Sequence, residues 1–181
     1  MTIFRGFILC VFLSFLYGGC SYSIHSNQYQ IIKGVFNASN NAQRPNTNSW
    51  KLDWSGYQFF VTPVNIGSQT WFVNKEKIVV RFDGWQVTNV ENLIAENISV
   101  NIKINGDEML FDANGRNFQS ASCSKWTEIP IITDKGRRLT QFCEQNGGSF
   151  VNEILIDKGG AIYGLSFKIH PRYANLVLSP A

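Results

Sequence analysis

The sequence is poor in the residues that catalysis most often requires. It has two histidines, His25 and His170, and no GxSxG, HExxH, CxxC or glycine-rich phosphate loop. Without an activating elbow, a serine triad cannot be built around His170. Asp107-Glu108 and Glu144 need no catalytic role as turn and strand-edge residues, although glycosidases do use paired carboxylates. We therefore expect no enzyme, no cofactor and no metal site.

Concentrated charge is also missing. The 16 Lys and Arg and 13 Asp and Glu are interspersed, for a formal net charge of +3. The one basic cluster, Lys135-Gly136-Arg137-Arg138, lies between turn-forming residues, which favours a solvated loop over a contact with phosphate or an acidic glycan. Nucleic-acid binders show a concentrated basic face, so we expect no nucleic acid among the partners.

No apolar run reaches the ~20 residues that span a bilayer. The longest, Gly6 to Tyr17, follows Arg5 and is followed by Gly18-Gly19, the order of a secretory signal with its cleavage site. Cleavage after Gly19 would leave Cys20 as the first mature residue. The alternatives are an ordinary signal peptide with an incidental Cys20, or a buried helix that is never processed.

The stretch LYGGCS at 16–21 resembles the lipobox of bacterial lipoproteins, with Tyr17 at the position where Leu is usual. That resemblance implies a diacylglycerol on the Cys20 sulfur and a fatty acid such as palmitate on its amine. Several acyl chains anchor a protein firmly. Ser21 in place of Asp implies the outer membrane, on its periplasmic side.

Cysteine is scarce, and its positions divide by role. Cys10 leaves with the signal and Cys20 is the lipidation candidate, so Cys123 and Cys143 remain as a pair. In an oxidising periplasm they should form a disulfide. A metal site is the competing interpretation, but neither has a second Cys or a His at ligand spacing.

The mature chain divides by composition into a tether and a domain. Residues 20–49 comprise the lipidated cysteine and a Ser-, Asn- and Gln-rich segment, which cannot bury enough apolar surface to order itself. From Trp50 to Ala181 the dominant period is two, clearest in NISVNIKI at 97–104. Asn105-Gly106 then predicts a two-residue hairpin turn. Only VENLIAEN at 90–97 could form a short helix.

Further strands are predicted at 57–62, 69–73, 77–82, 84–89, 107–111, 125–132, 139–143, 150–156, 161–169 and 174–178. Short, evenly spaced strands predict an all-β domain, either an antiparallel sandwich or a strongly curved sheet or half-barrel.

Aromatic residues crowd the first half of this domain. Trp54, Tyr57, Trp71 and Trp85 are candidates for contacts with a ligand or partner, because Trp and Tyr combine a large apolar area with a polar group. The alternative is that most of these side chains are core.

Two stretches resemble the small lipoproteins encoded with group 4 capsule and exopolysaccharide genes, the YjbF/GfcB type. They are TWFVNKEKIVVRFDGWQVTNVENL at 70–93 and NEILIDKGGAIYGLSFKIHPRYANLVLSP at 152–180. The resemblance implies a curved antiparallel sheet under an outer-membrane anchor. It also implies a non-enzymatic role in making or exporting a surface polysaccharide, through the glycan or an export protein.

Two other functions stay open. A lipid or lipoprotein carrier needs an enclosed apolar cavity. A secretion-system or envelope interaction module needs an unpaired sheet edge or a large apolar patch.

The first prediction concerns the anchor. Cys20→Ala should remove the protein from the membrane fraction, because no acyl chain can be attached to alanine. Cell fractionation and intact mass measure this outcome. An unchanged mass and unchanged membrane retention would contradict the lipoprotein interpretation.

Overall fold

The computed structural model describes residues 48–93, 98–130 and 136–181. The described residues belong to one compact unit. The predicted signal segment, Cys20 and the polar segment up to residue 47 lie outside the described residues, as does His25.

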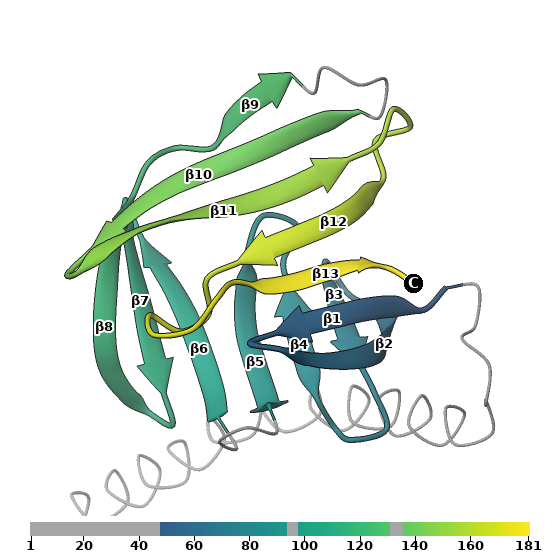
Figure 1. Ribbon diagram of the computed structural model, residues 1–181, viewed down its shortest axis with the longest axis horizontal. Coiled ribbons are helices and arrows are strands. Elements are labelled where there is room, and N and C mark those ends of the chain that lie inside the picture. Colours follow the sequence, from purple (N-terminus) through teal and green to yellow (C-terminus); the bar gives the residue numbers. More distant parts are fainter. Residues whose placement is uncertain (1–47, 94–97, 131–135) are drawn as a thin grey trace, which may run out of the picture. The chain divides into compact units, whose positions relative to one another are not determined.

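The described residues form thirteen strands (Figure 1). Their bounds are β1 Trp50–Trp54, β2 Tyr57–Ile66, β3 Gln69–Val73, β4 Val79–Phe82, β5 Val87–Leu93, β6 Ile98–Asn105, β7 Glu108–Ala113, β8 Arg116–Cys123, β9 Thr127–Pro130, β10 Arg137–Gln145, β11 Gly148–Ile156, β12 Ile162–Phe167 and β13 Leu176–Pro180.

The strands form one antiparallel sheet that closes on itself. Strands β1 to β8 pair in chain order, β8 pairs with β10, and β10 to β13 continue round to β1. Twelve strands thus make a closed barrel, and β9 is an extra strand that pairs with β10. The all-β, strongly curved antiparallel fold predicted from the sequence is confirmed.

The interior of the closed sheet is filled by apolar side chains. In Figure 1, β5 to β8 run steeply across the direction of β10 to β13, so the two sides of the sheet face each other with crossed strands. Aromatic contacts join the sides: Phe82 meets Phe167 at 6.0 Å, and Phe111 meets Phe150 at 6.3 Å between ring centroids. The same core includes Leu52, Val80, Val90, Val100 and Leu178.

Two turns show where the hairpin rules succeed and fail. Asn114 and Gly115 both have positive φ, at 51° and 81°, and form the two-residue loop between β7 and β8. Asn105, in contrast, pairs with Glu108, so the loop between β6 and β7 is Gly106-Asp107. The predicted turn is displaced by one residue, which places Ile104 opposite Met109.

The strand predicted at 84–89 begins later, at Val87, because the Asp83 carboxylate holds residues 84–86 in a loop. The helical alternative at 90–97 is wrong for Val90 to Leu93, which continue strand β5, and residues 94–97 lie outside the described part. Strands β1 and β8 are not among the strands predicted from the sequence.

The seam between β8 and β10 is short and is closed covalently. Strand β8 pairs with β10 through three residues. Cys123 lies opposite Cys143, Ser122 opposite Glu144, and Ala121 opposite Gln145. The first pair is the predicted disulfide, which joins Cys123 to Cys143 across the seam. Both cysteines are buried.

Replacing both cysteines by alanine should lower the free energy of unfolding by about 3 kcal/mol, because the 20-residue separation restricts the unfolded chain. Urea denaturation monitored by tryptophan fluorescence measures the change. Hydrogen exchange should increase more in β8 and β10 than in β2 and β3. Uniform exchange with unchanged stability would contradict a structural role for the disulfide.

Candidate functional site

A row of mainly polar side chains crosses the outer face of the sheet. Its members lie directly opposite one another on six successive strands, β3 to β8; we call them the polar row, and they are Trp71, Arg81, Asn89, Asn101, Asp112 and Asn117. Because side chains alternate between faces, the row points away from the core residues Val80, Val90 and Val100.

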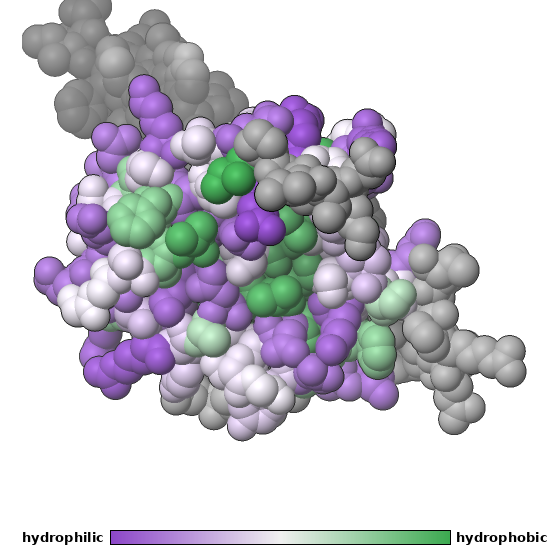
Figure 2. All heavy atoms as spheres, turned by 45° about the horizontal axis from the view of Figure 1, so that its top comes forward, coloured by the Kyte–Doolittle hydropathy of each residue, from purple (hydrophilic) through white to green (hydrophobic). Residues whose placement is uncertain are grey.

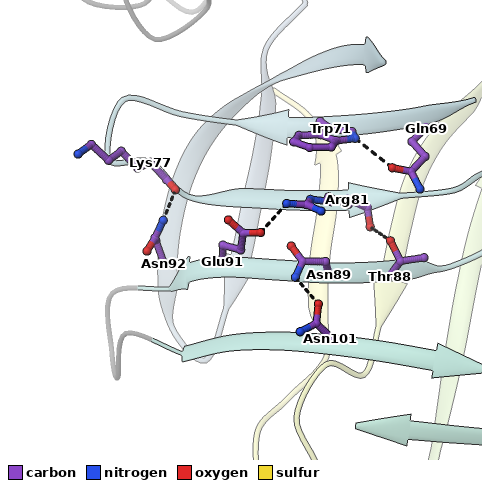
Figure 3. A network of polar contacts seen from close by, with 9 residues as sticks. All are labelled: Gln69, Trp71, Lys77, Arg81, Thr88, Asn89, Glu91, Asn92 and Asn101. Carbon is purple, nitrogen blue, oxygen red and sulfur yellow. Dashed lines mark hydrogen bonds and ion pairs between the residues drawn. The ribbon is translucent and has the colours of Figure 1, made fainter. Parts of the chain in front are cut away.

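Arg81 is the centre of contacts at the β3 to β5 end of the row (Figure 3). Its Nη2 donates to Glu91 Oε1 at 2.6 Å, and its guanidinium carbon lies 4.2 Å from the ring centre of Trp71. Trp71 Nε1 donates in turn to Gln69 Oε1 at 3.2 Å. The arginine is thereby held over the indole by an ion pair and a cation–π contact.

Asn89 and Asn101 form the middle of the row. Asn89 Nδ2 donates to Asn101 Oδ1 at 2.8 Å, as Figure 3 shows. At the next strand, Asp112 forms an ion pair with Lys103 at 3.7 Å. Since Arg81 is balanced by Glu91 and Asp112 by Lys103, this part of the outer face carries no net charge.

Several polar atoms of the row are buried without a hydrogen-bond partner among the described residues. They are Arg81 Nε, Asn89 Oδ1 and Asp112 Oδ1. Asn89 and Asp112 are only 7% and 9% exposed.

A second feature is an aromatic pair at the loop between β4 and β5. Trp85 is 58% exposed, and its ring centroid lies 6.5 Å from that of Trp126, the residue before β9. Trp126 packs edge-on against the buried Phe167 at 6.0 Å. The pair therefore extends the aromatic core out to the surface.

The four aromatic residues singled out in the sequence lie in different environments. Trp54 is a core residue at 1% exposure and Trp71 is 6% exposed beneath Arg81, whereas Tyr57 and Trp85 are exposed at 46% and 58%. Trp126 is not among the sequence candidates. It stands alone in a mostly polar stretch, and only the fold brings it against Trp85.

His170 packs against aromatic side chains. Its ring stacks on Phe118 at 5.1 Å and contacts Tyr173 at 4.8 Å, while its Nδ1 accepts the N–H of Arg172. Nearby, burial lowers the pKa of Lys168, whose ammonium donates to the Tyr173 carbonyl. Within the described ranges, no three His, Cys, Asp or Glu side chains gather as metal ligands.

The comparisons with known proteins bear on the fold. No family model matches the chain, and no curated protein matches it. Its structure is similar to the crystal structure of the hypothetical lipoprotein YmcC from Escherichia coli K12, with a TM-score of 0.52 and 9% identity over 89% of this chain and 96% of that one. This chain shares its fold with that hypothetical lipoprotein. At 9% identity the likeness concerns the fold alone. In residues 48–93, 98–130 and 136–181, no helix has the length and hydrophobicity needed to cross a membrane.

The Asn89–Asn101 pair predicts a mutational asymmetry. Asn101→Ala should destabilise the protein by about 1–3 kcal/mol, because it leaves the buried Asn89 amide with no partner. The double variant Asn89→Ala/Asn101→Ala should cost less than Asn101→Ala alone. Urea denaturation measures both, and Asn117→Ala, at an exposed position of the row, is the control. Additive losses in the double variant would contradict the pairing.

Proposed function

We propose that this protein is a non-catalytic lipoprotein, anchored through Cys20 to the periplasmic face of the outer membrane, that assists the production or export of a surface polysaccharide. The observation that carries the proposal is the likeness to a lipoprotein fold across most of both chains. It agrees with the lipobox-like LYGGCS and with the resemblance of residues 70–93 and 152–180 to capsule-associated lipoproteins.

The filled interior argues against a lipid carrier. A carrier of acyl chains needs an enclosed apolar cavity, and here the inner face of the closed sheet is occupied by packed side chains, among them Trp54, Phe111, Phe167 and Leu178. A depression lined by Ser120, Ser122, Glu144, Gln145 and Asn146 is open and polar. Such a lining suits hydroxyl and amide groups better than acyl chains.

An interaction module remains the second candidate because of strand β9. Among the described strands, β9 alone pairs on one side, so its other edge is available to an extended peptide. The strand is short and ends at Pro130, features that usually protect an edge from pairing. On the face drawn in Figure 2, hydrophobic residues form a strip at the centre and smaller groups beside it, all bordered by hydrophilic residues.

The proposal predicts a phenotype. A strain that lacks the gene should lose surface polysaccharide, and complementation with the wild-type gene should restore it, whereas Cys20→Ala should not, because the unanchored protein leaves the membrane. Quantifying surface polysaccharide in the three strains is the measurement.

Immunoblotting for equal protein levels is the control. Unchanged polysaccharide in the deletion strain would defeat the proposed function. Full rescue by Cys20→Ala would instead contradict only the claim that the protein needs its anchor for this function.

A further inference from the structure

The loop between β4 and β5 is built to hold Trp85 in one position. The Asp83 carboxylate oxygen Oδ1 accepts the backbone N–H groups of both Trp85 and Gln86 at 2.9 Å, and the Asp83 N–H donates to the Gln86 carbonyl at 3.1 Å. Gly84 supplies the φ of 104° that closes the loop. Residues 83–86 thus form a well-defined turn whose most exposed large side chain is an indole.

The base of this turn is fixed to the core. Phe82, the last residue of β4, packs on Phe167, and Trp126 packs on the same ring from the link between β8 and β9. Trp126 then meets Trp85 with the two ring planes at 46°. Because each ring is supported by the one beneath it, Trp85 loses little further freedom when it makes a contact.

The residues beside the two indoles indicate which kind of ligand would fit against them. The exposed and half-buried residues that flank them in the chain are polar, namely Gln86, Ser124, Lys125 and Thr127. Two rings are a small apolar area compared with the roughly 800 Å² per partner of a stable protein interface. A pyranose ring has one apolar C–H face and a rim of hydroxyl groups, which matches an indole with polar neighbours.

Other exposed aromatic side chains lack this support from neighbouring rings. Phe60 and Phe142 are exposed on outer strand faces, and Tyr57 is exposed at the start of β2. None of the three rings contacts another aromatic ring among the described residues, whereas Trp85 joins a series of rings that leads into the core.

We propose that Trp85, supported by Trp126 and held by the Asp83 loop, is a saccharide-stacking site that contacts a sugar ring of the surface polysaccharide. This inference rests on the proposed function, and it specifies the residues that touch the glycan. Trp85 is the contact residue. Asp83 is a positioning residue, because its carboxylate fixes the loop without facing the sugar.

The test uses the full mature lipoprotein purified in detergent. The probe is polysaccharide from the surface of the strain that carries the gene, cut to oligosaccharides. Titration monitored by tryptophan fluorescence and calorimetry should show saturable binding by the wild type. Trp85→Ala should weaken it about tenfold or more, since a central tryptophan is a typical binding hot spot. Trp85→Phe should retain most of the affinity.

Phe60→Ala is the matched control, because it removes an exposed aromatic ring of similar accessibility on strand β2. It should bind like the wild type. Circular dichroism and urea denaturation should show both alanine variants folded, since both side chains are exposed. Asp83→Ala should weaken binding while the packing of Trp126 on Phe167 is preserved. If Asp83 had only a structural role, the variant would not change the affinity in this way.

Equal affinity of the wild type and Trp85→Ala, or no oligosaccharide binding by the wild type, would overturn the inference. Vesicles of phosphatidylethanolamine and phosphatidylglycerol form a separate arm with the Cys20→Ala protein. Trp85-dependent vesicle binding without oligosaccharide binding would assign the indole to the lipid surface and overturn it as well. Trp85-dependent glycan binding supports the inference even if the deletion strain keeps its polysaccharide, in which case the proposed function alone fails.

Discussion

The structure depends on the closure of the sheet between β8 and β10. Most neighbouring strands are joined by short hairpins, so their pairing requires little loop-closure entropy. The seam instead brings together segments with β9 between them, and it has only three residue pairs. The Cys123–Cys143 disulfide lies at one of these pairs and holds it permanently in an oxidising compartment. Closure leaves β9 as the described strand with a free edge, and it encloses the apolar face of every other strand.

Because the interior is full, any ligand or partner has to bind outside it. The outer face offers two kinds of chemistry: the polar row across β3 to β8, which carries no net charge, and the exposed indole of Trp85. The row contains buried atoms without partners among the described residues, at a cost in stability, while Trp85 exposes apolar area to water. Exposed apolar area and unpaired buried polar atoms are both unfavourable for an isolated domain.

The sequence predicts those parts of the fold in which local pattern and burial agree. The alternation in NISVNIKI and the pairing of Cys123 with Cys143 both follow from residue type and spacing. Strand β1 carries the same signal, since Trp50, Leu52 and Trp54 alternate with Lys51 and Asp53. Strand β8 does not, because RNFQSASC is mostly polar and is ordered by its neighbours. Closure of the sheet depends on the β8 to β10 register, which no local pattern determines.

The error at 84–89 and the proposed saccharide site have the same cause. Trp85 and Val87 alternate with the polar Gln86 and Thr88, which favours a continuous strand, yet the Asp83 side chain accepts two backbone N–H groups that a strand would have paired. A carboxylate therefore replaces sheet hydrogen bonds at this point and turns the indole out of the sheet. The residue that interrupts the strand is the one that presents Trp85, so the local departure from the β pattern marks the position where the surface is most specialised.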